Sequence, residues 1–101
     1  MRVISWKQLG HFAKRHSDAE QPLKAWFKLL ETCKASNLTE LKSTFGSVDY
    51  VSINKREIYV FNVGGNKYRV VVEIKFKWQI AFVQCALTHS EYSTGEWKKA
   101  L

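Results

Sequence analysis

A chain of 101 residues, 46% of them hydrophobic, is long enough for a single domain and too apolar to stay disordered. Its formal net charge of +7 favours an anionic partner, nucleic acid first, over a neutral small molecule. Two cysteines, Cys33 and Cys85, lie outside any metal-binding spacing, which predicts reduced core thiols, no metal and no cofactor. No apolar run approaches the roughly 20 residues of a membrane span, so residues 1–101 are expected to form one soluble, cytoplasmic domain with no membrane partner.

The N-terminal part of the chain carries the apolar spacing of helices after a short strand. The segment MRVIS is short and β-branched, which predicts a first strand, and Ser5 can cap the helix that follows. Apolar residues share one face of that helix: Trp6, Leu9, Phe12 and Ala13. After SDAEQP a second apolar stripe predicts a second helix: Leu23, Trp26, Phe27 and Leu30. Asn37 and Glu40 then form a capping-box pattern that opens a short third helix, which Gly46 ends.

From Val48 the hydrophobic period changes to two, as it does in strands. Residues 58–63 alternate up to Gly64-Gly65, whose freedom to adopt positive φ suits a tight hairpin turn. A phosphate-binding loop would place a helix after these glycines, and the pattern predicts none there. Residues 67–78 and 80–88 complete a three-stranded antiparallel meander, with MRVIS as a further strand. The first two helices form a hairpin that covers this antiparallel sheet, so the predicted fold class is α+β.

The register of the last two strands decides which residues share a face. If residues 78–79 form a two-residue loop, apolar side chains of both strands oppose one another on the face toward the helices. The same register places Arg69 opposite Thr88 on the other, polar face, with Asn62 close to Arg69 on the neighbouring strand. Residues distant in sequence are therefore predicted to meet at one end of an open sheet face.

The segment THSE, residues 88–91, is a second capping-box pattern, so the last strand should run into a helical turn carrying His89 and Tyr92. Arg69, His89 and Tyr92 would then share one end of the sheet. An arginine can contact phosphate bidentately, a histidine can accept a proton near neutral pH, and a tyrosine can stack or donate a proton. No serine or cysteine nucleophile lies beside a base, and RNA cleavage needs none because the 2′-hydroxyl of the substrate attacks its own phosphate.

Each of these three residues also has a purely structural interpretation. Arg69 could pair with Glu73, which lies four residues further along the chain on the same face. His89 could be an ordinary residue of a first helical turn, and Tyr92 could cover the edge of the sheet. The residue pattern leaves these alternatives open.

The segments YVFNVGGNKYRVV and THSEY, with a looser match through LTELKSTFGSVDYV and the N-terminal helices, resemble the HigB toxin family of bacterial type II toxin–antitoxin systems, within the RelE/ParE-like group. The resemblance implies a RelE-like fold, ribosome-dependent cleavage of mRNA, and inhibition by a small helix-turn-helix antitoxin. It implies contact with operator DNA only through the antitoxin complex. It also implies that Arg69 contacts the phosphate and that His89 and Tyr92 form the catalytic pair. Asp49, in the loop before the sheet, is a weaker match.

Relatives in this family often carry a basic residue at the position of Gln84, where a second cation would help the transition state. With a neutral side chain there, either Lys55, Lys75 or Lys77 substitutes or the enzyme is slow. Lys75 and Lys77 are either a solvated strand end or contacts to the phosphate backbone; the Lys55-Arg56 pair either grips RNA or is an exposed turn. The expected RNA-binding residues are Lys55, Arg56, Asn62, Lys67, Lys75, Lys77 and Gln84.

The sequence supports one function over two rivals. We expect an RNA-cleaving toxin that acts on ribosome-bound mRNA, because the pair His89 and Tyr92 suits proton transfer and stacking. A non-enzymatic relative of the ParE type would instead poison a target such as DNA gyrase by binding, which the neutral Gln84 mildly favours. The third candidate is a basic scaffold that only co-represses DNA with its antitoxin.

Overall fold

The computed structural model describes residues 1–4 and 6–101, without the side chain of Trp6. Along the chain, the elements are β1 (Arg2–Ile4), α1 (Trp6–Arg15), α2 (Glu20–Thr32), α3 (Leu38–Phe45), β2 (Val48–Ile53), β3 (Arg56–Val63), β4 (Tyr68–Lys75), β5 (Ile80–Thr88) and α4 (His89–Thr94). Three short 3₁₀ helices cover Ser17–Ala19, Phe76–Trp78 and Glu96–Ala100. Within the described residues, no helix is long and apolar enough to cross a membrane.

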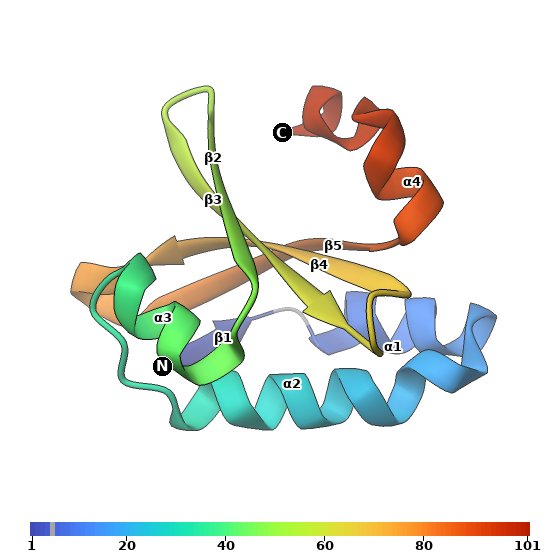
Figure 1. Ribbon diagram of the computed structural model, residues 1–101, viewed down its shortest axis with the longest axis horizontal. Coiled ribbons are helices and arrows are strands. Elements are labelled where there is room, and N and C mark those ends of the chain that lie inside the picture. Colours follow the sequence, from blue (N-terminus) through green and yellow to red (C-terminus); the bar gives the residue numbers. More distant parts are fainter. Residues whose placement is uncertain (5) are drawn as a thin grey trace.

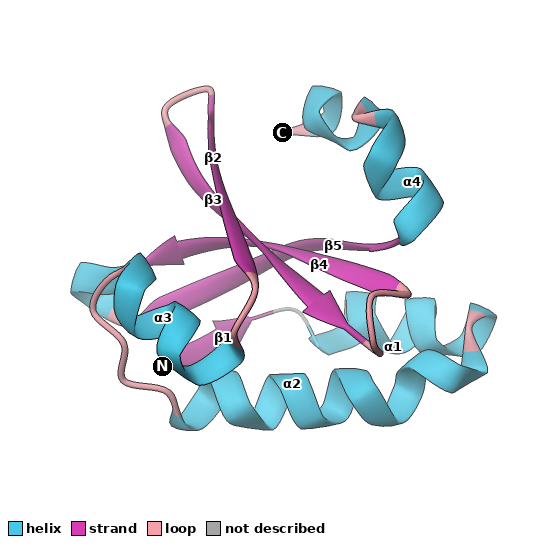
Figure 2. Cartoon of the chain, in the orientation of Figure 1, coloured by secondary structure: helices cyan, strands magenta, loops and turns pink. Residues whose placement is uncertain are grey.

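The strands form one sheet in the order β1-β5-β4-β3-β2. Neighbouring strands are antiparallel except β1, which pairs in parallel with β5. Figure 2 shows this sheet as a single twisted layer, and Figure 1 shows α1 and α2 on one side of it and α4 on the other. The predicted α+β class, the helical hairpin and the N-terminal strand are confirmed, but the sheet is mixed and has a strand, β2, that the sequence pattern did not predict.

The face toward α1 and α2 holds the main hydrophobic core. Six residues of the two predicted apolar stripes are buried in it: Leu9, Phe12, Ala13, Leu23, Trp26 and Leu30. Phe27 is only partly buried. The predicted cap Ser5 and the side chain of Trp6 lie outside the described residues. At the start of α3, the Asn37 side chain accepts a bond of 2.9 Å from the Glu40 amide, as the capping pattern predicts. The Glu40 carboxylate bonds to the Ser36 amide at 2.6 Å instead of returning to Asn37.

The connection between β4 and β5 differs from the predicted two-residue loop. Residues Phe76–Trp78 form a 3₁₀ turn and Gln79 is left-handed, so Lys75 pairs with Ile80. A β-bulge between Val71 and Val72 then shifts the register once more. Arg69 is therefore opposite Leu87, and the predicted pairing of Arg69 with Thr88 is wrong.

The far face of the sheet, predicted to be polar and open, carries a second hydrophobic cluster. Its buried members are Ile58, Val60, Val71 and Trp97. Cys85 and Leu87, predicted to face the helices, pack against this cluster instead. The bulge explains this, because one extra residue in β5 reverses which face each following side chain points to. The C-terminal segment packs on this face next to the β2–β3 hairpin (Figure 1), where the Asn54 side chain donates to the Leu101 carbonyl at 2.8 Å.

Candidate active site

Arg69 is the central residue of the site. Its side chain is 7% exposed, and it is the one buried charged residue in the described part of the chain. Its Nη1 donates to the carbonyl oxygens of Asn66 at 3.0 Å and Tyr68 at 3.2 Å. In residues 1–4 and 6–101 it forms no ion pair, so the alternative pairing with Glu73 is wrong. These carbonyls accept from Nη1 but leave the positive charge of Arg69 unneutralised, and a buried cation without a counter-ion is energetically unfavourable.

The start of α4 brings His89 to this guanidinium. The predicted capping box is present: the Thr88 hydroxyl accepts from the Glu91 amide at 3.2 Å, and the Glu91 carboxylate accepts from the Thr88 amide at 2.9 Å. The His89 amide donates to the Lys67 carbonyl at 2.9 Å, which fixes α4 against the β3–β4 turn. As a result, His89 Nδ1 lies 3.0 Å from Arg69 Nη2.

This contact determines which nitrogen of His89 carries the proton. A guanidinium has donors and no acceptor, so Nδ1 must accept the hydrogen bond from Arg69. In the neutral imidazole the proton then sits on Nε2, which is left as a donor. The site as it stands therefore offers His89 to a substrate as a hydrogen-bond or proton donor. The sequence-based role of a proton acceptor would require the other tautomer.

Tyr92 completes the predicted group of three. The Arg69 Cζ lies 5.4 Å from the centroid of the Tyr92 ring, a distance typical of a cation–π contact. The Tyr92 hydroxyl is 3.4 Å from Asp49 Oδ2. Burial, followed by the negative charge and hydrogen bond of Asp49, raises the pKa of Tyr92, while Arg69 opposes this shift. The phenol therefore stays protonated at neutral pH and can act as a donor.

Two neighbours of this group come from the β2–β3 hairpin. Asn62 pairs with Arg69 across β3 and β4, as the sequence pattern predicts. Asp49 was expected in a loop, but it lies in β2 opposite Val60, and this strand carries its carboxylate to Tyr92. Among the described contacts of the three predicted catalytic residues, Asp49 supplies the one carboxylate.

Trp97 is a site neighbour that the sequence analysis missed. Its ring stacks on the Tyr92 ring with centroids 5.4 Å apart and planes at 19°. Its Nε1 donates to the Tyr92 carbonyl at 3.1 Å. An aromatic residue placed shortly after a helix-ending glycine, Gly95, was the available signal, because such a residue can fold back on the last turn of the helix.

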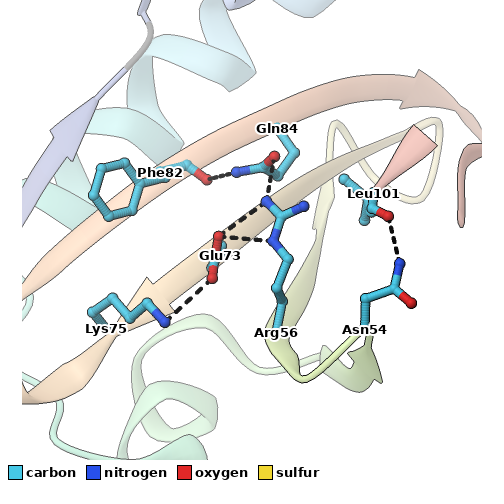
Figure 3. Close-up of polar contacts among 7 residues, drawn as sticks. All are labelled: Asn54, Arg56, Glu73, Lys75, Phe82, Gln84 and Leu101. Carbon is cyan, nitrogen blue, oxygen red and sulfur yellow. Dashed lines mark hydrogen bonds and ion pairs between the residues drawn. The ribbon is translucent and has the colours of Figure 1, made fainter.

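A second arginine, Arg56, lies on the same face of the sheet, because it alternates along β3 in step with Asn62, which pairs with Arg69. Figure 3 shows its polar contacts. Its Nε and Nη2 donate to Glu73 Oε1 at 3.1 and 3.0 Å, and Nη2 also donates to Gln84 Oε1 at 2.8 Å. Lys75 Nζ lies 3.3 Å from Glu73 Oε2. Burial opposes ionisation of Glu73, but the bonds and charges of Arg56 and Lys75 outweigh it and hold the pKa of this carboxyl below its ordinary value. The cation beside Gln84 is thus Arg56, not one of the three lysines considered as substitutes, and a carboxylate neutralises it.

Comparisons with known proteins identify the family of this chain. A family model described as HigB toxin, the RelE-like toxic component of a toxin–antitoxin system, matches residues 19–95. The chain belongs to the HigB toxin family. It is 32% identical over 92 residues to the mRNA interferase toxin HigB of Escherichia coli (strain K12), covering 91% of this chain and 88% of that protein. The mRNA interferase HigB of Shigella flexneri gives the same values, and that of Escherichia coli O6:H1 is 26% identical over the same length.

The remaining residues predicted to bind RNA are spread over the surface of this HigB-family chain. Lys55 is exposed in the β2–β3 turn, and the Lys77 ammonium lies 5.2 Å from the centroid of the Trp78 ring. Lys67 forms an exposed ion pair with Asp18 at 3.4 Å. The sheet rise of about 3.3 Å per residue puts Glu73, with its partners, roughly 13 Å along β4 from Arg69. The predicted set is therefore not one patch: Asn62 pairs with Arg69, and Lys67 contacts His89 through its backbone carbonyl.

The cysteines have no place in this chemistry. Cys33 is buried in the main core, and both thiols are free. Burial, with a smaller contribution from Glu91, raises the pKa of the Cys85 thiol to about 11, so it is not a thiolate at neutral pH. Within residues 1–4 and 6–101, no group of three or more His, Cys, Asp or Glu side chains is placed to hold a metal ion.

Proposed function

We propose that this chain is the toxin of a type II toxin–antitoxin system and that it is an mRNA interferase, an endoribonuclease that cuts mRNA on the ribosome. The observation that carries this proposal is the buried, unpaired guanidinium of Arg69, held between His89 and Tyr92. A phosphodiester is an anion that suits such a guanidinium, because two oxygens of the phosphate can accept two parallel hydrogen bonds from the planar guanidinium. The relatives named mRNA interferases support the same chemistry.

The reaction needs no protein nucleophile. The 2′-hydroxyl of the RNA loses a proton and its oxygen forms a bond to the adjacent phosphorus. The bond from phosphorus to the 5′-oxygen of the next nucleotide breaks, and that oxygen takes a proton. A 2′,3′-cyclic phosphate and a 5′-hydroxyl result. The protein must therefore orient the phosphate, stabilise the charge that develops on it, accept one proton and donate another.

We assign these tasks to different side chains by their positions in the site. Arg69 stabilises the charge on the phosphate oxygens. His89, with its proton on Nε2, donates to the leaving oxygen or to a phosphate oxygen. Asp49 is the carboxylate nearest to these donors and accepts the proton of the 2′-hydroxyl, while Tyr92 holds its hydroxyl toward Asp49 and offers its ring to a base. Lys55, Lys67, Lys75 and Lys77 contribute positive potential along the rest of the RNA.

A toxin of this kind has an antitoxin partner. We expect a small helix-turn-helix protein, and contact with operator DNA only through the complex with it. The net charge of +7 gives an acidic segment of that protein a surface to bind. Masking the Arg69 group or keeping the toxin off the ribosome would each suffice for inhibition.

The test is cleavage of a defined mRNA on programmed ribosomes, with toxicity followed in parallel. We expect discrete cuts within the ribosome-bound codon and no cuts in the same mRNA free in solution. If growth stops while mRNA stays intact and DNA gyrase is inhibited, the chain acts by binding, as ParE-type toxins do, and the proposed cleavage of mRNA is wrong. If free and ribosome-bound mRNA are cut at equal rates, the chain is a nuclease but its activity does not depend on the ribosome.

A further inference from the structure

The segment that follows α4 packs back on the sheet beside the candidate active site. Gly95 ends α4 with a positive φ of 75°, which suits a residue without a Cβ, and turns the chain. The next residues form the 3₁₀ helix Glu96–Ala100, whose Trp97 is 8% exposed. The family match ends at residue 95, so this tail lies beyond the part that the chain shares with the family model.

The contacts of Trp97 converge on Tyr92. The two rings stack, and the indole Nε1 donates to the Tyr92 carbonyl, which also accepts from the Gly95 amide at 3.2 Å. Side chain and backbone of Tyr92 are thus both in contact with Trp97. The same Tyr92 ring lies 5.4 Å from the Arg69 Cζ, so the stack connects the tail to the buried cation.

The far end of the tail is fixed as well. The Leu101 carbonyl accepts a hydrogen bond of 2.8 Å from the Asn54 side chain in the β2–β3 turn. Leu101 also packs against the second hydrophobic cluster, in which Trp97 is buried. Because the tail is held at Gly95, at Trp97 and at Leu101, the indole ring has little freedom to move away from Tyr92.

We propose that Trp97 is a positioning residue of this toxin, acting through Tyr92 to hold the phenol ring over Arg69. The role in cleavage rests on the function proposed above, but the positioning itself is a property of the free protein. A displacement of about 1 Å in a reacting group can lower a rate by as much as 10²-fold, so an indole outside the reaction can still control it. If Trp97 had only a structural role, it would cover the second hydrophobic cluster, and the Tyr92 ring would keep its position over Arg69 when the indole is removed.

The first experiment needs no substrate. The Nε–H resonance of Arg69, assigned in ¹⁵N-labelled protein with the Arg69→Lys variant, reports the ring current of Tyr92. We expect Trp97→Leu, which keeps an apolar side chain in the cluster, to move this resonance in the same direction as Tyr92→Ala and by at least half as much. Trp97→Phe keeps a ring to stack and should stay close to the wild-type position. Val48→Ala, which removes buried methyl groups from the other core, is the stability-matched control and should leave the resonance unmoved.

The second experiment follows cleavage on programmed ribosomes. We expect Trp97→Leu to lower the cleavage rate at saturating ribosomes about tenfold, with KM changed less than about twofold. In a Tyr92→Ala background, the same substitution should not lower the cleavage rate any further. An Arg69 resonance that stays at its wild-type position in Trp97→Leu overturns the inference, and so does an equal loss of rate in both backgrounds. If the resonance moves but the wild-type protein cuts no mRNA, the positioning stands and the proposed nuclease function fails.

Discussion

Arg69 and Arg56 lie on the same face of one sheet, yet their surroundings differ in the one respect that decides their chemistry. Arg56 is 31% exposed in its side chain and donates two hydrogen bonds to the Glu73 carboxylate. Arg69 is 7% exposed, and its hydrogen bonds within the described part of the chain go to carbonyl oxygens and to a neutral histidine nitrogen. The more exposed arginine is neutralised, and the buried one is not.

This contrast separates a structural ion pair from a site built to bind an anion. The bonds from Arg56 to Glu73 and Gln84 connect three strands and need no ligand. Arg69 is held by hydrogen bonds that leave its charge unneutralised, and it is pre-oriented by His89 and Tyr92. A fixed, unneutralised cation with little water around it is the arrangement that stabilises charge in a transition state most strongly.

The largest expected effect comes from removing Arg69. Arg69→Ala should lower the cleavage rate by about 10²–10³-fold, because it deletes the charge that the phosphate meets in the transition state. Arg69→Lys should recover only part of this loss, since an ammonium cannot donate two parallel bonds. The measurement is single-turnover cleavage on programmed ribosomes, with thermal unfolding as the control for folding. Full recovery by lysine would show that only a point charge is needed.

Changes at the donors beside Arg69 should have the next largest effect. His89→Gln and Tyr92→Phe should each lower the rate by about 10²-fold or less, since general acid–base groups contribute on this scale. Tyr92→Phe keeps the stacking surface and removes the hydroxyl that faces Asp49, so it separates proton donation from stacking. Asp49→Asn is the matched variant on the other side of that contact. If Asp49→Asn cleaves at the wild-type rate, another group accepts the proton of the 2′-hydroxyl.

On the Arg56 side, the expected effect is on stability. The folded-state pKa of Glu73 lies below its ordinary value of 4.5, so its ion pairs stabilise the fold above that pH and are lost as pH falls through the folded-state pKa. Glu73→Gln should therefore lower the free energy of unfolding by about 1–2 kcal/mol at pH 7, a difference that shrinks below pH 4.5. Denaturant unfolding at several pH values measures this. An unchanged stability at pH 7 would mean that the pair contributes nothing net.

The smallest effects should come from the exposed lysines. Lys55→Ala and Lys77→Ala should each raise KM for ribosome-bound mRNA by about two- to threefold and reduce the slope of log affinity against log salt by up to about one. The rate at saturation should not change, because neither side chain reaches the Arg69 group. Lys98→Ala, in the C-terminal 3₁₀ helix, is a control of equal charge loss. A salt slope that falls equally in all three variants would show a general field instead of local contacts.

The sequence predicted the parts of the structure that depend on local pattern. Apolar spacing located both main helices, and the capping patterns located the starts of α3 and α4. The parity of β4 placed Arg69 on the face away from the helices although the predicted register was wrong, because Arg69 alternates with the core residues Tyr68 and Val70 whatever the pairing with β5. The group of Arg69, His89 and Tyr92 followed from this parity and from the capping box at Thr88.

What the sequence could not predict depends on contacts between distant segments. The bulge lies at Gln84, and the residues that follow it are apolar at 85, 86 and 87, so Cys85 and Leu87 fit either face. The edge strand β2 has one buried residue, Val48, and its weak alternation hid both the strand and the position of Asp49. The partner of Arg56 could not be identified without the register, because Glu73 is 17 residues from Arg56 in sequence and much closer to Arg69.

The direct test of the contrast is a side-by-side comparison of Arg69→Gln and Arg56→Gln in single-turnover cleavage of mRNA on programmed ribosomes. Each variant deletes one positive charge from the same face and keeps a polar side chain. The unneutralised cation should matter most: we predict a loss of at least about 10²-fold for Arg69→Gln and of less than about threefold for Arg56→Gln. Equal losses, or a larger loss for Arg56→Gln, would contradict the assignment of Arg69 as the cation that stabilises the phosphate.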